Sequence, residues 1–242
     1  MPFTRARYDE HAQWYDDWNK PNAEHNTPYV LDLLGPGEGL CLDLGCGSGL
    51  YFDALASTGR TVVGLDRSAD QLRIARGRRR QVVQADAAVL PFADRTFPAV
   101  VTLWVSTDVD DFGAVLAEAV RVLTPGGLLV FFGAHPCFNG PHVEWMDDGG
   151  VRAHTTYRQA GWHSESPWWG KYIRRRVGMR HHPLAELLSA FIRTELAIEQ
   201  VTELGERAVP TILAIGARKR VSAGTSGTIA PDVSAETSGA PG

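Results

Sequence analysis

Cysteine is scarce in this sequence of 242 residues, and long apolar runs are absent. The three cysteines are an odd number, and Cys41 and Cys46 fall in one apolar segment and the loop after it, so a disulfide framework is not predicted. No stretch reaches the roughly 18 apolar residues that a membrane-spanning helix requires, and no signal-peptide core follows the N-terminus. These absences predict a cytoplasmic protein that does not cross a membrane.

Positive charge is not in excess either. The formal net charge is −4, which provides no general attraction to nucleic acid. Arginines gather only at 76–80 and 174–176, and we interpret both clusters as solvated ends or faces of helices, with binding of RNA or of an acidic acceptor as the alternative. Eight histidines are present, but neither H-E-x-x-H nor paired C-x-x-C spacing occurs, so no metal site is predicted.

The sequence does contain a loop of alternate glycines. Residues 40–44 are apolar except for Asp43 and are too few for a helix, which predicts a buried strand. Glycines at 45, 47 and 49 then leave the peptide groups open to a ligand, and the next residues favour a helix whose N-terminus presents free N–H groups. A dinucleotide fingerprint G-x-G-x-x-G would need a glycine where Leu50 stands. The loop therefore predicts a small-molecule site of another kind.

Acidic residues end the next two predicted strands. The strand at 61–66 ends in Asp66, and the strand at 81–87 ends near Asp86. Ligands of open α/β sheets bind at the carboxyl ends of the strands, where an acid after the second strand can accept hydrogen bonds from ribose hydroxyls. Alternating strands and helices continue to residue 218, which predicts an α/β fold.

Three motifs resemble those of one family. The run from Asp43 to Gly49 reads D-x-G-x-G-x-G and resembles the first motif of the class I S-adenosylmethionine-dependent methyltransferases. The run at 90–101 and the L-T-P-G-G-x-L-V-F run at 123–131 are similar to later motifs of its small-molecule members, which include those of ubiquinone and menaquinone biosynthesis, although Pro98 replaces the usual aspartate. The resemblance implies a Rossmann-like sheet of seven strands in the order 3-2-1-4-5-7-6, with the last strand antiparallel and helices on both faces.

The resemblance also implies a site for S-adenosyl-L-methionine, which becomes S-adenosyl-L-homocysteine on methyl transfer. In the family, acids equivalent to Asp43, Asp66 and Asp86 address the ammonium group, the ribose and the adenine of the cofactor. The residues expected to bind the cofactor are Tyr15, Asp43, Gly45, Cys46, Gly47, Gly49, Asp66, Arg67, Asp86, Ala87 and Trp104.

We expect a single domain over 1–220 and a disordered tail over 221–242, which is rich in Ser, Thr, Gly and Ala. Within the domain, 8–35 would form a helical lid of two helices, the second capped by Thr27 and beginning at Pro28. The irregular insertion at 135–182 would form the acceptor pocket. His135 follows the fifth strand and is a candidate general base, with a histidine satisfied by loop carbonyls as the alternative.

The predicted function is methyl transfer to a small-molecule acceptor, by O- or C-methylation of an apolar or aromatic metabolite. DNA is not expected as a partner, and the oligomeric state stays open. Three other functions remain as alternatives: an RNA methyltransferase, a cofactor-binding protein that transfers no methyl group, and a nucleotide-binding oxidoreductase.

Overall fold

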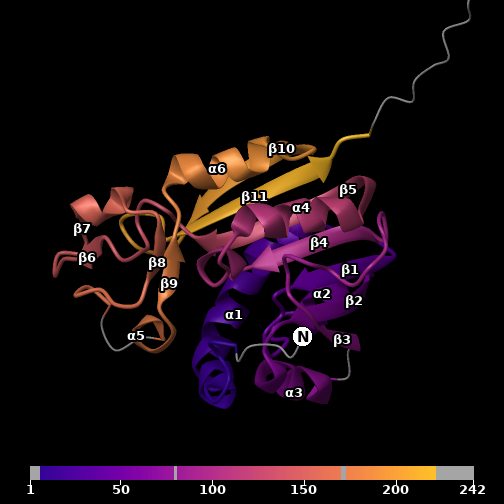
Figure 1. Ribbon diagram of the computed structural model, residues 1–242, viewed down its shortest axis with the longest axis horizontal. Helices are drawn as coiled ribbons and strands as arrows, with labels where there is room; N and C mark the ends of the chain where they lie inside the picture. Colours follow the sequence, from indigo (N-terminus) through magenta and orange to yellow (C-terminus); the bar gives the residue numbers. More distant parts are fainter. Residues whose placement is uncertain (1–5, 79–80, 170–172, 222–242) are drawn as a thin grey trace, which may run out of the picture.

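The computed structural model describes residues 6–78, 81–169 and 173–221, and the centre of this part is a seven-stranded sheet in the order β10-β11-β5-β4-β1-β2-β3 (Figure 1). The strands are β1 Leu40–Leu44, β2 Thr61–Asp66, β3 Gln81–Gln84, β4 Phe97–Leu103, β5 Leu123–Ala134, β10 Leu196–Leu204 and β11 Ile212–Lys219. The first five are parallel, and β11 runs antiparallel to both of its neighbours. The predicted strand order and the antiparallel last strand are confirmed.

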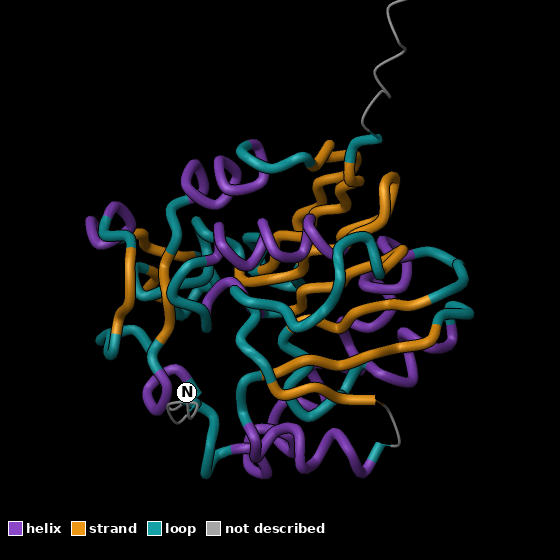
Figure 2. The backbone as a smooth tube through the Cα atoms, turned by 45° about the vertical axis from the view of Figure 1, so that its right-hand side comes forward, coloured by secondary structure: helices purple, strands orange, loops and turns teal. Residues whose placement is uncertain are grey.

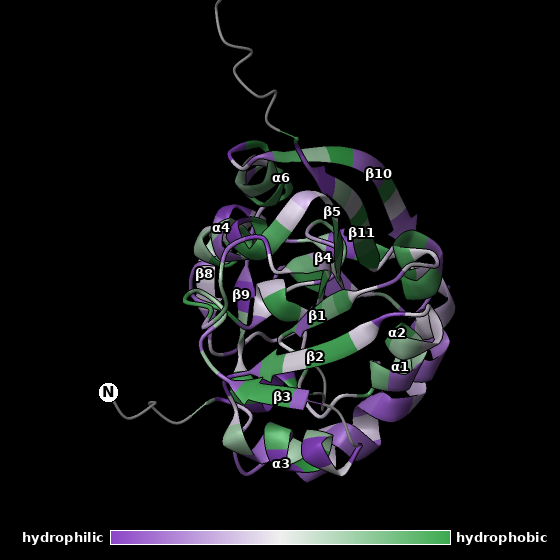
Figure 3. Cartoon of the chain, turned by 90° about the vertical axis from the view of Figure 1, so that its right-hand side faces the viewer, coloured by the Kyte–Doolittle hydropathy of each residue, from purple (hydrophilic) through white to green (hydrophobic). Residues whose placement is uncertain are grey.

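Helices cover both faces of the sheet, as Figure 2 shows. Their bounds are α1 Ala12–Leu34, α2 Phe52–Ser57, α3 Ala69–Gly77, α4 Phe112–Val122 and α6 Leu184–Ile192. Residues of α1, α2 and α3 share one hydrophobic core, whereas α4 and α6 share the other. Side chains alternate along a strand, so Cys41 of β1 enters the first core and Leu42 enters the second. A strand buried on both faces is expected to be mainly apolar, as β1 is apart from Asp43. Figure 3 shows the strands of the sheet coloured largely as hydrophobic.

The N-terminal helix corrects the prediction of two helices, the second beginning at Pro28. The structure has one helix, Ala12–Leu34, with Pro21 and Pro28 inside it. Thr27, expected as a helix cap, instead donates its hydroxyl to the carbonyl oxygen of Ala23 at 2.8 Å. A proline inside a helix removes one N–H donor and costs about 3 kcal/mol. Packing of α1 against the sheet offsets that cost, because helices in proteins are stabilised mainly by their buried face.

The insertion at 135–182 is also more regular than predicted. It contains β6 Val143–Trp145 paired with β7 Val151–Ala153, and β8 Gly161–His163 paired with β9 Met179–His181. A short helix, α5 Arg174–Val177, precedes β9. Figure 1 shows these elements together beside the end of the sheet toward which the β4 arrow points. The predicted tail falls, from residue 222 onward, outside the described residues.

Candidate functional site

A cavity of about 440 Å³ opens at the carboxyl ends of the central strands. Its walls come from the N-terminal segment, the glycine loop, the ends of β2 and β3, and the turn that follows β4. Eight of the predicted cofactor residues line it: Tyr15, Gly45, Gly47, Asp66, Arg67, Asp86, Ala87 and Trp104. The fold therefore brings together side chains from the first 104 residues at the edge where open α/β sheets bind ligands.

A second cavity, of about 540 Å³, lies at the opposite edge of the sheet, near Arg60 and Pro125. The Arg60 guanidinium donates to the carbonyl oxygen of Gly35 at 2.7 Å and to Thr58 Oγ1 at 2.9 Å. These contacts tie the ends of α1 and α2 to the start of β2. We assign this cavity a structural role.

The three glycines of the loop differ in how much space surrounds the position of a Cβ. Gly45, Gly47 and Gly49 all have positive φ, at +78°, +54° and +80°. A Cβ on Gly45 would lie 2.4 Å from Val105 Cγ2, and one on Gly49 would lie 2.5 Å from the Phe52 ring. A Cβ on Gly47 would meet its nearest atom, Gln71 Oε1, only at 3.7 Å. Gly45 and Gly49 therefore allow close packing of the protein, whereas Gly47 leaves room that a ligand can use.

Asp66 links the loop to the end of β2. Its Oδ2 accepts the N–H of Gly47 at 2.8 Å, and its Oδ1 accepts the N–H of Ser68 at 2.8 Å. Burial raises the pKa of this carboxyl, although the two N–H groups oppose the shift. A carboxylate held in this way has a fixed direction and retains lone pairs that can accept hydroxyl donors from a ligand.

Asp43 lies beneath the glycine loop rather than in the cavity wall, and is 2% exposed. Burial raises the pKa of its carboxyl to about 7, and the neighbouring Asp66 carboxylate adds to the shift. A cation beside these two neighbouring carboxyls would stabilise their charged forms.

Cys46 is also outside the cavity wall. Its sulfur lies 2.8 Å from the position that a Cβ on Gly64 of β2 would take.

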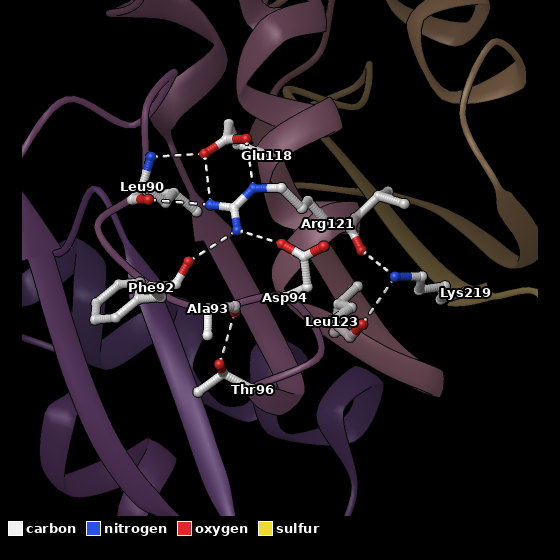
Figure 4. Close-up of polar contacts among 10 residues, drawn as sticks. Leu90, Phe92, Ala93, Asp94, Thr96, Glu118, Arg121, Leu123 and Lys219 are labelled. Atoms are coloured by element: carbon white, nitrogen blue, oxygen red, sulfur yellow. Dashed lines mark hydrogen bonds and ion pairs between the residues drawn. The ribbon is translucent and has the colours of Figure 1, made fainter.

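The loop after β3 presents Asp86 and Ala87 to the cavity. Asp86 Oδ1 accepts the N–H of Ala88 at 3.0 Å, which fixes the carboxyl in a tight turn. Farther along, the loop is tied to α4 by Arg121, which donates to the carbonyl oxygens of Leu90 and Phe92 and to two carboxylates (Figure 4). The Asp86 side of the cavity therefore rests on a loop fixed at both ends.

Tyr8 and Tyr15 form the wall contributed by the N-terminal segment. Their rings meet edge to face with centroids 4.9 Å apart, and the Tyr8 hydroxyl donates to Asp108 Oδ1 at 3.0 Å. Burial raises the pKa of both phenols, and Asp108 adds to the shift, so both stay protonated at neutral pH. Asp9 accepts the Ser68 hydroxyl at 2.6 Å, which holds this segment against the start of α3.

One arginine of each cluster is drawn inward, whereas Arg76, Arg175 and Arg176 are exposed as predicted and residues 79–80 lie outside the described residues. Arg78 contacts both carboxylate oxygens of Asp16, at 2.9 and 3.0 Å. Arg174 contacts both oxygens of Asp108, at 2.6 and 3.2 Å. Burial alone would lower the pKa of the Arg174 guanidinium, but the Asp108 carboxylate raises it overall. These two arginines are therefore paired within the fold.

His135 does not line the cavity. It is 2% exposed, its Nδ1 accepts the N–H of Cys137 at 3.1 Å, and its Nε2 lies 2.7 Å from Glu203 Oε1. Because Nδ1 is an acceptor, Nε2 carries the proton and donates to Glu203. Both ring nitrogens are occupied by the protein, which supports a histidine satisfied by its neighbours over a base for an acceptor.

Gln71 lines the cavity but has no place in the sequence-based set. It is 2% exposed, and its Oε1 has no hydrogen-bond partner among the described residues. The Ser68 hydroxyl caps α3 by accepting the N–H of Gln71 at 3.2 Å, so residue 71 stands three positions after a recognisable cap. A buried acceptor without a partner is costly, and a ligand donor would satisfy it.

A comparison of the sequence with family models matches part of the chain. Residues 42–131, which run from β1 into β5, match the model described as a methyltransferase domain. Together with the sheet order above, this match supports a class I S-adenosylmethionine-dependent methyltransferase.

Two curated relatives share this stretch. The demethylmenaquinone methyltransferase of Renibacterium salmoninarum is 36% identical over 145 residues, which are 56% of this chain and 60% of that protein. The fatty-acid O-methyltransferase of Mycolicibacterium smegmatis is 38% identical over 138 residues, 54% of this chain and 48% of that protein. The matches thus span about half to three fifths of the length of these relatives.

Solved structures support the fold. An S-adenosylmethionine-dependent methyltransferase from Mesorhizobium loti superposes with a TM-score of 0.65 at 24% identity, covering 80% of this chain and 97% of that one. The geranyl diphosphate C-methyltransferase of Streptomyces coelicolor superposes with a TM-score of 0.59 at 16% identity, covering 81% of this chain and 76% of that one.

In the part of this chain that the structure describes, no helix has both the length and the apolar character needed to cross a membrane.

Proposed function

We propose that this protein binds S-adenosyl-L-methionine in the 440 Å³ cavity and transfers its methyl group to a small-molecule acceptor. The observation that carries the proposal is the convergence on one cavity of Gly47, which leaves backbone space, Asp66, which is oriented by two N–H groups, and Asp86, which lies in a fixed turn. The ribose would bind at Asp66 and Gln71, and the adenine at Asp86 and Ala87.

The chemistry is a displacement in which an acceptor atom attacks the methyl carbon of the sulfonium as the carbon–sulfur bond breaks. The cofactor supplies the activated methyl group and the leaving group. The chain's contribution is to hold acceptor and methyl group in line and to exclude water. Tyr8, Tyr15 and Trp104 make one wall of the cavity aromatic, and this wall suits an apolar or aromatic acceptor and supports O- or C-methylation.

The first test is thermal unfolding with S-adenosyl-L-homocysteine, with NAD as the comparison ligand. A ligand that binds only the folded state at a hundred times its Kd stabilises by about 2.7 kcal/mol, which raises the Tm of a chain of this size by roughly 5 °C or more. A shift with NAD and none with S-adenosyl-L-homocysteine would contradict the proposal.

The second test is transfer of labelled methyl from S-adenosyl-L-methionine to acceptors of two types, a naphthohydroquinone and a long-chain fatty acid. These probes represent the substrates in the names of the two relatives. Labelled product with either probe supports methyl transfer, and the position of the methyl group, read by NMR of the product, distinguishes C- from O-methylation. Cofactor binding without transfer to any acceptor of a wider panel would favour a binding protein.

A further inference from the structure

The insertion and the N-terminal segment contact each other beside the cavity. The Arg7 guanidinium lies 3.6 Å from the centroid of the Trp162 ring, which belongs to β8. The Arg176 guanidinium of α5 lies 4.5 Å from the centroid of the Trp14 ring in α1. Two segments separated by more than 100 residues are thus joined directly at two places.

A third connection passes through Asp108, in the turn after β4. Its Oδ1 accepts the Tyr8 hydroxyl at 3.0 Å and Arg174 Nη1 at 2.6 Å. Its Oδ2 accepts Arg174 Nη2 at 3.2 Å and lies 3.1 Å from the Thr107 hydroxyl, whose single proton has the Trp104 carbonyl oxygen at 3.2 Å as its other acceptor. Three of the roughly four lone-pair positions of this carboxylate are therefore used by Tyr8 and Arg174 alone. Asp108 cannot turn without breaking one of these bonds, and the Tyr8 hydroxyl is therefore fixed in direction.

Arg174 is what holds Asp108 in this orientation. Its guanidinium forms a bidentate ion pair with the two carboxylate oxygens. It also donates to Thr107 Oγ1 at 2.8 Å and to the Gly178 carbonyl oxygen at 3.3 Å. Its side chain is only 20% exposed, so the pair is shielded from water and from salt. Arg174 itself does not line the cavity, whereas Asp108, Tyr8 and Tyr15 do.

We propose that Arg174 is a positioning residue of the cofactor site: acting through Asp108, it holds Tyr8, and through the Tyr8 ring Tyr15, against bound S-adenosyl-L-methionine. The inference rests on the proposed function and goes beyond it, because it makes cofactor affinity depend on the insertion. An acceptor that moves α5 would then change how tightly the cofactor is held.

A double-mutant cycle on S-adenosyl-L-homocysteine affinity, measured by titration calorimetry, tests the proposal. Arg174→Met should weaken binding about tenfold and Tyr8→Phe about fivefold, the latter being the size of one lost hydrogen bond. In the Arg174→Met background, Tyr8→Phe should weaken binding less than about twofold, because Asp108, the hydrogen-bond partner of the Tyr8 hydroxyl, is already displaced.

The matched control is Arg60→Met, which removes another partly buried arginine with several protein contacts, at the opposite edge of the sheet. It should leave affinity unchanged, and the cost of Tyr8→Phe should stay about fivefold in its background. Equal costs of Tyr8→Phe in the Arg60→Met and Arg174→Met backgrounds, or wild-type affinity in Arg174→Met, would overturn the proposal.

Arg174→Met leaves Asp108 as a buried charge without its partner, so it can fail to fold. The variant with both Asp108→Asn and Arg174→Met removes that charge, and it too should weaken binding and make Tyr8→Phe nearly neutral. Full affinity in this folded variant would refute the positioning role.

Hydrogen exchange of residues 8–16 without ligand separates this inference from the proposed function. Release of the segment should speed exchange there in Arg174→Met or the double variant, but not in Arg60→Met. If wild type binds no S-adenosyl-L-homocysteine, the proposed function fails, and faster exchange would show only that Arg174 orders the segment. Unchanged exchange would overturn the inference even if wild type binds the ligand.

Discussion

Asp43 allows a direct test of where the amino group of the cofactor lies. Its carboxyl is 2% exposed and has a pKa of about 7, so in the ligand-free protein it is largely protonated at pH 5.5. A cation within hydrogen-bond reach lowers a carboxyl pKa by roughly 1 to 3 units. An ammonium group placed beside Asp43 should therefore bring its pKa to about 5 and drive the proton into solution.

The size of the effect follows from these two values. Because the ammonium binds the ionised carboxylate, affinity for S-adenosyl-L-homocysteine must rise as the pH rises toward 7. The pKa of Asp43 is taken as about 7 in the free protein and about 5 in the complex. The affinity then rises roughly tenfold between pH 5.5 and pH 7, and about 0.8 proton is released per bound ligand at pH 6.

The assay is calorimetric titration at several pH values in two buffers with different ionisation enthalpies, which counts the protons released. The control ligand is 5′-methylthioadenosine, which keeps the adenine and ribose but lacks the ammonium group. Its affinity should be nearly independent of pH. In Asp43→Asn the pH dependence for S-adenosyl-L-homocysteine should disappear and the affinity should fall. Equal pH dependence for both ligands would refute the placement of the ammonium at Asp43.

Three further predictions concern single residues of the site. Gly47→Val should abolish binding of S-adenosyl-L-homocysteine in calorimetry, because it fills the space beside Gln71 at a φ of +54°, while circular dichroism should still show the α/β fold. Gln71→Leu should weaken the same binding about fivefold, the size of one hydrogen bond, and unchanged affinity would show that its carboxamide does not contact the ligand. His135→Gln should leave the affinity for S-adenosyl-L-homocysteine and the kcat of any detected transfer within about twofold, and a large loss of kcat would restore His135 as a base. The same variant should lower the Tm, since it disturbs the buried contact with Glu203.

Much of the part of the cavity around the glycine loop could be predicted, because its residues lie near one another in the chain. Asp43 and the three glycines span seven consecutive positions, and Asp66 stands at the end of the next strand. Parallel neighbouring strands align their carboxyl ends, so β1, β2 and β3 bring these groups to one edge without any long-range information. Local spacing therefore fixes both the conformation of the loop and the neighbours it acquires.

His135 shows where this reasoning stops. It follows β5 at the predicted edge of the sheet, yet its ring turns toward Glu203 of β10 and away from the cavity. The position of a residue in a strand places its backbone, but the direction of the next side chain depends on which groups the rest of the fold offers. Here β10, which is separated from β5 by β11, offers a carboxylate that lies 68 positions later in the sequence.

Two arginines of the clusters, Arg78 and Arg174, depart from the prediction for the same reason. Runs such as 76–80 and 174–176 usually face solvent, and the sequence contains no local sign that Arg78 would meet Asp16 or that Arg174 would meet Asp108. The partners are 62 and 66 residues away. Only packing of α1 and of the insertion against the sheet makes these pairs.

The sequence by itself determined the class of fold, the glycine loop and the acids Asp66 and Asp86 that line the cavity, because each depends on short-range spacing and on the alternation of buried strands with helices. The tertiary structure alone decided the contacts that link the N-terminal segment, the turn after β4 and the insertion. Tyr8, Asp108 and Arg174 come from these three segments, and a carboxylate can collect such donors only after the chain has folded around it. Long-range packing likewise places Gln71 beside Gly47 and His135 beside Glu203.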